Sequence, residues 1–529
     1  MAKYIFVTGG VVSSLGKGIV ASSIGVLLKA RGLKVTMQKF DPYINVDPGL
    51  MSPLQHGEVF VTKDGAETDL DLGHYERFID ENLTRYSSVS SGRVYKAVID
   101  NERKGKYSGK TVQVIPHITD EIKRLLKRAA TNTKADVVIV EIGGTVGDME
   151  SLPFLEAIRQ ARRDFGHENT FYIHATLVPY LKAAGELKTK PTQHSVKELK
   201  SLGIQPDMLV LRSEEPIEQE HIDKISLFTD LPPESILQSY DMKVVYEILL
   251  NLQQQHIDDI ILKHFELDNL KKANVKEWQQ LVEQIKKSDK KLTVAIIGKY
   301  VSLHDAYISI IESLRHAGFK MSTLIDLIWV DSEKVTELNI SKYLEGADGI
   351  IIPGGFGHRG TEGKLLALEY GRKNLIPTLG ICFGMQLAAI EFAQNVLGIS
   401  DVCSEEFENC HNPIIQKNSN HKFKLGEYTT NLKEGSKIRE IYNQSQIKER
   451  HRHRFEFNPE FSDLFEQNGM MITGYNRQIK AVDVLELTNH PWYVHVQYHP
   501  EYISRPLKPH PLFLSFLEAC KNNKNQKTD

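Results

Sequence analysis

Apolar runs alternate with helix-like stretches along most of the chain, and this alternation predicts parallel β-sheets. The first apolar run, Tyr4–Thr8, has the composition of a buried strand, and residues 19–31 after it have the composition of a helix. Gly32 ends that helix, and a second strand begins at Leu33. A strand–helix–strand opening of this kind implies a parallel sheet. Further strands are expected at residues 136–141, 171–174 and 208–211.

A change of composition near residue 270 separates two such regions. The stretch 267–291 is polar and helix-capable, contains one of the three tryptophans of the chain, Trp278, and carries several lysines: Lys271, Lys272, Lys276, Lys286, Lys287, Lys290 and Lys291. A new apolar run at 292–298 then opens a second α/β region. We expect the α/β class with two three-layer α/β domains, divided as 1–266, a linker helix at 267–290, 291–520, and a polar, disordered tail at 521–529.

The overall composition narrows the possible partners and compartments. A chain of 529 residues is long enough for two to four domains. Its formal net charge is −3 without a long run of one sign, so we expect neither a nucleic-acid nor a membrane partner. Four unevenly spaced cysteines are too few for a disulfide framework or a zinc ribbon, which favours a reducing, cytoplasmic location. The start Met1-Ala2-Lys3 leads directly into a strand and does not resemble a signal peptide.

The clearest chemical signal is a cysteine between two glycines, Gly380-Ile381-Cys382-Phe383-Gly384, directly after an apolar run at 376–379. This G-x-nucleophile-x-G pattern predicts a sharp strand-to-helix turn that presents the thiol. Glycine on either side allows the turn to form without Cβ clashes, and the helix N-terminus favours the thiolate. The alternative interpretation is a buried cysteine in an ordinary βα turn.

A candidate base for this thiol lies far downstream. Residues 493–499 alternate like a strand and end in His499-Pro500-Glu501. His499 can take the thiol proton, and Glu501 can orient the imidazole ring, which together make a nucleophile–base–acid triad. The alternative is a histidine that happens to end a strand, but the elbow, the His-Pro-Glu ending and the chain order together favour the triad.

A glycine-rich turn between the first strand and the first helix, residues 9–18, predicts a phosphate site. Successive backbone N–H groups there can bind phosphate oxygens, and Lys17 can reach a terminal phosphate. The turn departs from the standard P-loop pattern, because Gly10 lies one residue too far from Gly16 and Gly18 replaces the magnesium-binding hydroxyl. It is therefore a variant P-loop, with an ordinary glycine-rich turn as the alternative.

Without the loop hydroxyl, Mg²⁺ needs oxygen ligands from elsewhere in the chain. Glu141 ends the strongest apolar strand, where a charge is costly without a partner, and Asp71 lies in a short acidic turn that could equally be solvated. Lys39 follows the second strand and can neutralise a transferring phosphoryl group. The loop 188–194 carries two lysines, two hydroxyls and an amide, which suit a triphosphate and a base edge or equally a surface loop.

At this point whole phrases of the sequence resemble the CTP synthase family. The resemblance covers nearly the whole chain and is carried by the segments 7–18, 41–49, 55–61, 64–78 and 141–148. It implies an N-terminal P-loop-like (dethiobiotin-synthetase-like) amidoligase and a C-terminal class I glutaminase. It also implies that Mg-ATP phosphorylates the uracil O4 of UTP and that ammonia then displaces phosphate to give CTP. The ammonia would come from glutamine through a Cys382 thioester and travel between sites through a tunnel.

The resemblance assigns roles to individual residues. In the amidoligase, Lys17 and Lys39 are implied to be catalytic, and Asp71 and Glu141 to bind Mg²⁺. The implied ATP contacts are Ser14, Leu15, Gly16, Lys17, Gly18, Ile19 and Asp71. The implied contacts of UTP, or of CTP as an inhibitor, are Ser13, Asp148, Met149, Glu150, Lys188, Thr189, Lys190, Pro191, Thr192, Gln193 and Lys224.

In the glutaminase, Cys382, His499 and Glu501 are implied to be catalytic, and the Gly355 and Phe383 N–H groups to form the oxyanion hole. The implied glutamine contacts are Gly355, Phe383, Gly384, Met385, Gln386, Glu406 and Arg454. Arg359 and Glu362 resemble residues linked to activation by GTP. The family also implies a homotetramer, and filaments are an additional possibility on which the sequence is silent.

The sequence departs from the family in three places. Phe383 stands where leucine is common, Met149 lies in the middle of Asp148-Met149-Glu150, and residues 412–430 are short and divergent. Two other readings compete with the resemblance. A cobyric acid synthase-like amidotransferase would pair the same two modules, and the loops 188–193 and 55–61 argue against it; a non-catalytic scaffold would lack catalytic side chains that are all present here. In GMP synthase the glutaminase module comes first in the chain.

Overall fold

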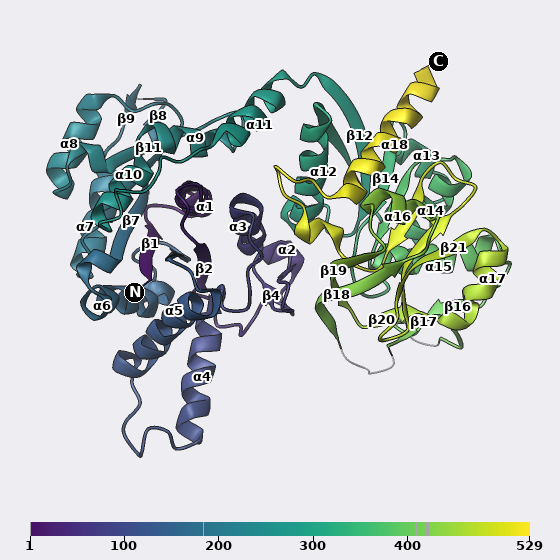
Figure 1. Cartoon of the computed structure of the whole chain (residues 1–529), viewed down its shortest axis with the longest axis horizontal. Helices are drawn as coiled ribbons and strands as arrows, with labels where there is room; N and C mark the ends of the chain where they lie inside the picture. The colour runs from purple at the N-terminus through teal and green to yellow at the C-terminus, as the bar shows by residue number, and fades with distance from the viewer. Residues whose placement is uncertain (1, 184, 408–409, 419–422, 529) are drawn as a thin grey trace. The chain divides into compact units, whose positions relative to one another are not determined.

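The computed structural model describes residues 2–183, 185–407, 410–418 and 423–528 (Figure 1). The chain forms two compact units, and one short segment crosses from the first part of the sequence into the second unit. Unit 1 comprises Met1–Leu50 and Asp71–Lys286, and unit 2 comprises Met51–Leu70 and Lys287–Asp529. The excursion of residues 51–70 into unit 2 is not something that the hydrophobic pattern predicts.

Unit 1 is built on a seven-stranded sheet in which every neighbouring pair is parallel. In spatial order its strands are β11 (Ile236–Tyr240), β10 (Met208–Ser213), β7 (Thr170–Leu177), β1 (Lys3–Gly9), β6 (Val137–Ile142), β2 (Val35–Asp41) and β5 (Ser88–Ser90). All the strands predicted for this region are present, and the parallel arrangement is confirmed.

Helices cover both faces of this sheet, because successive side chains of a strand point to opposite sides. Val138 and Val140 of β6 belong to a core with α5 and α6, whereas Ile139 lies against α1 near Gly25. The main helices of unit 1 are α1 (Lys17–Ala30), α3 (Asp71–Ile79), α4 (Ser91–Arg103), α5 (Thr119–Thr133), α6 (Leu152–Phe165), α7 (Lys190–Ser201), α8 (Gln219–Thr229), α9 (Glu247–Gln254) and α10 (Ile257–His264). A small hairpin, β8 (Tyr180–Leu181) with β9 (Glu186–Leu187), precedes α7.

The predicted linker helix exists as α11 (Lys276–Lys287), which is shorter than the expected span of 267–290. Its tryptophan, Trp278, is buried, with its ring centroid 5.9 Å from that of Phe78 and 5.4 Å from that of Tyr246. The helix therefore packs against unit 1 through this aromatic cluster and is not an isolated, fully solvated linker.

Unit 2 contains a nine-stranded mixed sheet. In spatial order its strands are β13 (Thr323–Asp331), β12 (Lys290–Gly298), β14 (Gly349–Ile352), β15 (Thr378–Ile381), β23 (Tyr493–Val496), β22 (Ala481–Leu487), β21 (Met470–Asn476), β18 (Lys424–Leu432) and β19 (Gln446–His453). The pairs from β13 to β23 are parallel, and the remaining pairs are antiparallel. The α/β class predicted from the sequence is confirmed for both units.

The two faces of this sheet carry separate cores. Ile350 and Ile352 of β14 pack with residues of α14 and α15, and Ile351 packs with residues of α12 and α18. The helices of unit 2 are α2 (Pro53–His56), α12 (Ile308–Lys320), α13 (Ile340–Tyr343), α14 (Thr361–Lys373), α15 (Phe383–Asn395), α16 (Lys437–Tyr442), α17 (Ser462–Gln467) and α18 (Pro511–Thr528). Smaller sheets join β16 (Val402–Ser404), β17 (Asn412–Lys417) and β20 (Phe455–Phe457), and β3 (Phe60–Val61) with β4 (Glu67–Thr68).

Two sequence-based expectations need correction. The polar tail from residue 521 was expected to be disordered, but α18 continues to Thr528. The Asn523 side chain donates to the Asp348 carbonyl at 3.0 Å and Lys524 donates to the Lys291 carbonyl at 2.9 Å, so polar residues attach this end of the helix. In addition, Cys403 and Cys410 form a disulfide that cysteine count and spacing did not predict. The argument from cysteine usage therefore no longer supports a cytoplasmic location, which stays a prediction.

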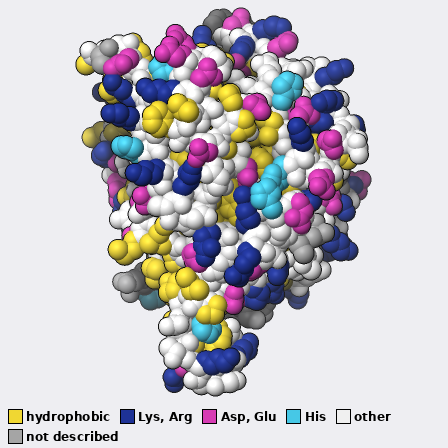
Figure 2. Space-filling view, turned by 90° about the vertical axis from the view of Figure 1, so that its left-hand side faces the viewer, with side chains coloured by type: hydrophobic (Ala, Val, Ile, Leu, Met, Phe, Trp, Pro, Cys, Tyr) yellow, Lys and Arg dark blue, Asp and Glu magenta, His cyan; other side chains and the backbone are white. Residues whose placement is uncertain are grey.

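Charged side chains of both signs are mixed on the surface, in agreement with the near-neutral formal net charge of −3. On the face shown in Figure 2, Lys and Arg side chains are interspersed with Asp and Glu side chains, and hydrophobic side chains lie between them. None of the helices in the described part of the chain has both the length and the apolar character required to cross a membrane. The divergent stretch 412–430 contains residues 419–422, which lie outside the described residues, so its role stays open.

Candidate active sites

Cys382 lies at the sharp turn between β15 and α15, as the glycine spacing predicts. Its backbone has φ 54° and ψ −103°, a strained conformation for a residue with a side chain. A Cβ on Gly384 would come within 2.1 Å of the Ile352 carbonyl oxygen, and one on Gly380 within 2.8 Å of the Gly384 backbone. Glycine is therefore required on both sides of Cys382, which confirms the predicted elbow geometry.

The predicted base and acid are brought to this elbow by β23, which pairs in parallel with β15. His499 Nδ1 and Glu501 Oε1 lie 2.7 Å apart, and both side chains are buried. With Nδ1 engaged by Glu501, Nε2 is the ring nitrogen available to take the thiol proton. Burial alone would lower the pKa of His499, but the neighbouring Glu501 carboxylate and Cys382 raise it to about 10. This environment stabilises the protonated imidazole that forms when His499 takes the thiol proton.

A glycine-rich loop at residues 353–357 lies against the triad. A Cβ on Gly354 would meet His499 Cε1 at 3.1 Å and Cys382 Cβ at 3.6 Å, so the loop touches both groups. Two lysines that the sequence did not single out hold its carbonyls: Lys364 donates to Pro353 O at 3.1 Å, and Lys299 donates to Phe356 O. The loop is thus fixed beside the sulfur, where backbone N–H groups can face an oxyanion.

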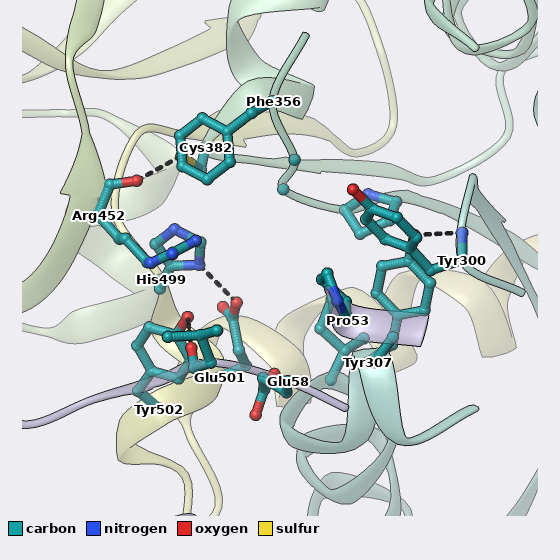
Figure 3. A pocket seen from close by; sticks show the side chains of 16 residues that line it. Pro53, Glu58, Tyr300, Tyr307, Phe356, Cys382, Arg452, His499, Glu501 and Tyr502 are labelled. Atoms are coloured by element: carbon teal, nitrogen blue, oxygen red, sulfur yellow. Dashed lines mark hydrogen bonds and ion pairs between the residues drawn. The ribbon is translucent and has the colours of Figure 1, made fainter. Parts of the chain in front are cut away.

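These groups line a cavity of about 100 Å³ within unit 2 (Figure 3). Cys382, His499, Glu501 and residues 353–356 form part of its wall. The rest of the wall was missed by the sequence analysis, namely Pro53, Glu58, Val59, Tyr300, Ala306, Tyr307, Ile310, Arg452 and Tyr502. Pro53, Glu58 and Val59 come from the excursion 51–70, and no local sequence signal places that segment beside a cysteine more than 300 residues away.

The predicted glutamine contacts are arranged around the same loop. The Glu406 carboxylate accepts the Gly357 N–H at 2.7 Å, and burial raises the pKa of this carboxyl group. Arg454 is exposed and stacks over the Phe423 ring at 4.9 Å. Gln386 is buried, and its amide donates to Phe455 O at 2.9 Å, so this side chain is held inside the protein. Gly355 lies in the loop 353–357, and Phe383, Gly384 and Met385 lie at the start of α15.

A second cavity, of about 350 Å³, lies in unit 1 where the glycine-rich turn meets the carboxyl ends of β2 and β6. It is lined by most of the residues predicted for ATP and magnesium, namely Ser13, Ser14, Leu15, Gly16, Lys17, Gly18, Ile19, Lys39, Asp71 and Glu141, together with His74, Gly143 and Gly144. His74, one turn beyond Asp71 in α3, was missed. Carboxyl ends of parallel strands are the expected place for a ligand site, so the arrangement supports a nucleotide pocket.

Charged groups in this cavity are closely paired. The Lys39 ammonium is hydrogen-bonded to Asp71 and lies 2.9 Å from Glu141 Oε1, while the Tyr75 hydroxyl donates to the other Glu141 oxygen. Burial alone would lower the pKa of Lys39, but Asp71 and Glu141 raise it well above its ordinary value. Burial and the Lys39 charge lower the pKa of Lys17, whose amine donates to Gly144 O.

The two carboxylates fit a magnesium site. Mg²⁺ usually keeps several waters and is held by one or two carboxylates plus substrate phosphates, and Asp71 and Glu141 converge on one cavity beside the phosphate loop. Among the described residues, no cluster of three or more His, Cys, Asp or Glu side chains could hold a metal by itself. Substrate phosphates would therefore have to complete the coordination.

The predicted uridine-nucleotide residues do not all meet in this cavity. Apart from Ser13, none of them is among the described residues that line it. Lys188 and Thr189 precede α7, the Thr192 hydroxyl is buried and donates to Leu177 O at 3.0 Å, and Gln193 donates to the Thr189 hydroxyl at 3.1 Å. Met149 is 80% exposed. These contacts stay predictions, as do those of Asp148, Glu150, Lys190, Pro191 and Lys224.

A buried histidine connects α7 to the glycine-rich turn. His174 Nδ1 lies 2.8 Å from the Thr8 hydroxyl, and its Nε2 lies 2.9 Å from the Ser195 hydroxyl on α7. A Cβ on Gly10 would come within 1.6 Å of Ser195 Oγ, so the turn is packed directly on α7. The loop 188–193 that leads into α7 is thereby anchored close to the start of the phosphate loop.

Unit 2 has the elbow, the histidine–carboxylate pair and the glycine-rich loop of a thiol-dependent amidotransferase, and the family model "Glutamine amidotransferase class-I" matches residues 302–519. The model "CTP synthase N-terminus" matches residues 3–267. The chain is 57% identical to a CTP synthase of Onion yellows phytoplasma (strain OY-M), over 99% of this chain and 98% of that one, and 56% identical to a CTP synthase of Bacillus subtilis (strain 168), over the whole of both. The chain belongs to the CTP synthase family.

Among solved structures, the glutaminase domain of Trypanosoma brucei CTPS with bound acivicin is 33% identical. It covers 44% of this chain, 94% of that domain is aligned, and the TM-score is 0.42.

Proposed function

We propose that the protein converts UTP to CTP with ATP, taking nitrogen from glutamine or from free ammonia. The main support for glutamine hydrolysis is that the elbow cysteine, Cys382, lies beside the buried His499, which is hydrogen-bonded to the carboxylate of Glu501. The amidoligase half is supported by a phosphate loop, two lysines and two carboxylates that share one cavity. Membership of the CTP synthase family supports the pairing of these two activities.

In the glutaminase reaction, His499 takes the proton of Cys382, and the thiolate attacks the amide carbon of glutamine. The oxygen of the tetrahedral intermediate is stabilised by the N–H groups of Gly355 and Phe383. His499 then returns the proton to the departing nitrogen, so ammonia leaves and a thioester remains. Water, deprotonated by His499, hydrolyses the thioester to glutamate. Glu406 and Arg454 supply the charges that would bind the amino and carboxylate groups of the substrate.

In the amidoligase reaction, the glycine-rich turn binds the triphosphate of ATP, and Lys17 and Lys39 neutralise the phosphoryl group that passes to the uracil O4. Mg²⁺ held by Asp71 and Glu141 would neutralise phosphate oxygens. Ammonia attacks C4 and displaces phosphate. We further propose that the ammonia is transferred without release, that CTP inhibits and GTP activates the enzyme, and that it works in the cytoplasm, all of which rest on the family resemblance.

We also propose a homotetramer, on the same resemblance. Unit 1 exposes several large hydrophobic side chains, including Leu50 (97%), Met149 (80%) and Ile44 (71%), which an assembly could cover. Light scattering coupled to size-exclusion chromatography, with and without UTP and ATP, measures the mass directly. A monomer under every condition would refute the tetramer.

One assay tests the division of labour between the units. The purified protein is incubated with UTP, ATP, Mg²⁺ and either glutamine or ammonium, and CTP is measured. Cys382→Ala should abolish CTP formation from glutamine and leave formation from ammonium intact, because only the thiol nucleophile is lost. Lys17→Ala should abolish both, because phosphoryl transfer serves either nitrogen source. Loss of both activities in Cys382→Ala, or ammonium-driven synthesis in Lys17→Ala, would refute the assignments.

A further inference from the structure

The sulfur of Cys382 has a second polar neighbour that the proposed mechanism does not use. Gln497 is fully buried, and its Nε2 donates to Cys382 Sγ at 3.6 Å. On another side the thiol donates to the carbonyl oxygen of Arg452, also at 3.6 Å. The sulfur therefore lies between one hydrogen-bond donor and one hydrogen-bond acceptor, and the titratable side chains of His499 and Lys364 interact with it as well.

The position of Gln497 follows from the sheet. Ile381 pairs with Val496 in the register of β15 and β23, and the Cys382 N–H donates to Val496 O at 2.7 Å. Gln497 is the next residue, so the end of β23 places its side chain next to the elbow. This position is fixed by the same strand pairing that brings His499 to the site.

A second glutamine fixes which end of the Gln497 amide faces the sulfur. Gln386 Nε2 donates to Phe455 O at 2.9 Å and to Gln497 Oε1 at 3.3 Å. If the Gln497 amide were reversed, its NH₂ group would face the NH₂ group of Gln386, and two donors would be left without an acceptor in the interior. The hydrogen bonds from Gln386 therefore determine that the Gln497 NH₂ group points at Sγ.

The two neighbours of the sulfur respond in opposite ways when the thiol loses its proton. The Arg452 carbonyl accepts from the S–H and becomes a repulsive contact for a thiolate. The Gln497 N–H becomes a donor to an anion, and such charge-assisted bonds are roughly twice as strong as neutral ones. Cys382 and Gln497 are both buried, so little solvent screening weakens the bond between them.

We propose that Gln497 selectively stabilises the thiolate of Cys382, and that Gln386 is a positioning residue that holds the Gln497 amide in the required orientation. The proposal rests on the nucleophilic role of Cys382 proposed above. It also gives Gln386 a role other than contact with the substrate, because its side chain is committed to Phe455 and Gln497.

The test is the pH dependence of alkylation of Cys382 by iodoacetamide, followed by mass spectrometry so that Cys382 is distinguished from Cys520, which is also outside the disulfide. Gln497→Met keeps the side-chain length and removes the donor, and Gln386→Met removes only the group that orients it. Gln394→Met is the matched control: Gln394 is a partly buried glutamine of the same helix α15 that donates to Val402 O.

In Gln497→Met the pH of half-maximal alkylation should rise by about one unit, because a hydrogen bond to a charged group is lost. Gln386→Met should shift it in the same direction by less, and Gln394→Met should match the parent protein. A Gln497→Met protein with an unchanged circular dichroism spectrum and an unchanged alkylation profile overturns the proposal. If Gln497→Met does not fold, Gln386→Met decides by the same criterion.

The same experiment separates this inference from the proposed function. If alkylation of Cys382 in the parent protein leaves glutamine hydrolysis intact, the nucleophilic role of Cys382 is wrong. If alkylation abolishes hydrolysis but the variants titrate like the parent, only the role of Gln497 is wrong. Iodoacetamide reacts with the thiol without binding at the glutamine site. A weaker affinity of Gln386→Met for glutamine therefore does not affect the measured alkylation profile.

Discussion

The substitution Glu501→Gln tests the electrostatics of the glutaminase site most directly. It removes one negative charge 2.7 Å from His499 Nδ1 and keeps an oxygen that can accept the ring N–H. The two side chains are only 9% and 4% exposed, so their interaction is not strongly screened by water. A charge pair at that distance and an effective dielectric constant near 20 is worth about 6 kcal/mol.

This magnitude agrees with the raised pKa of His499. Burial opposes protonation, yet Glu501 and Cys382 raise the pKa from 6.5 to about 10, a change of about 5 kcal/mol between the two protonation states. Without the carboxylate, burial should bring the pKa of His499 down toward or below its ordinary value. At pH 7.5 the imidazole would then be neutral, and Cys382 would lose the positive charge beside it.

The expected result is a fall in kcat for glutamine hydrolysis of about 10²- to 10⁴-fold, as for loss of the orienting acid in other triads. Glutamate release is measured from pH 6.5 to 9.5, and ammonium-driven CTP synthesis in the same preparation reports whether unit 1 is intact. Glu518→Gln, an exposed acid on α18, is the control. A kcat within about threefold of the parent protein at every pH would refute the reasoning.

Three further predictions concern stability and the amidoligase site. The folded-state pKa of His499 lies above its ordinary value of 6.5, so the stabilisation that its protonation provides is complete below pH 6.5 and is lost as the pH rises toward 10. The difference in Tm between the parent protein and Glu501→Gln should therefore shrink between pH 6.5 and pH 10. A Tm difference that stays constant over this range would contradict the prediction. Gly10→Ala should sharply reduce CTP synthesis from both glutamine and ammonium, because the new Cβ would lie 1.6 Å from Ser195 Oγ. Adding Ser195→Gly in a double variant should partly restore CTP synthesis. Full activity of Gly10→Ala alone would show that the turn can move freely and would refute the argument. Arg372→Met should lower the free energy of unfolding in urea by about 3 kcal/mol, because it leaves the fully buried Glu391 carboxylate without its ion-pair partner, whereas Arg315→Met, at an exposed ion pair on α12, should change it by less than about 1 kcal/mol; equal effects would refute the argument.

Much of this architecture could be predicted from local sequence patterns. Buried strands can be recognised as apolar runs in the sequence. The elbow at Cys382 can be recognised because its geometry requires glycine two residues before and two residues after the cysteine. His499 and Glu501 are detectable because they follow such a strand directly. Glu141 could be singled out because it ends an apolar strand, whereas Asp71 in its acidic turn gained its role mainly from the family resemblance; the structure brings both to Lys39.

What could not be predicted depends on contacts between distant segments. Lys364 and Lys299 look like ordinary surface lysines in the sequence, and only the fold places them behind the loop 353–357. The polarity of the Gln497 amide depends on Gln386, more than a hundred residues earlier in the chain. The end of α18 is held by hydrogen bonds to the carbonyl oxygens of Asp348 and Lys291. Its own residues are polar and show no helical hydrophobic periodicity, so the sequence did not predict a helix there.

The placement of residues 51–70 has a practical consequence for dividing the protein. Within unit 2 this segment forms an ion pair between Glu67 and Arg452, and its backbone carbonyl at Val61 accepts from the buried Arg450. A fragment cut at the linker and beginning at residue 287 would leave both guanidinium groups without these partners and would remove Pro53, Glu58 and Val59 from beside the thiol. Isolating unit 2 by a single cut at the linker thus removes part of the wall of the cavity beside Cys382, whereas a fusion that carries residues 51–70 ahead of residue 287 retains that part of the wall.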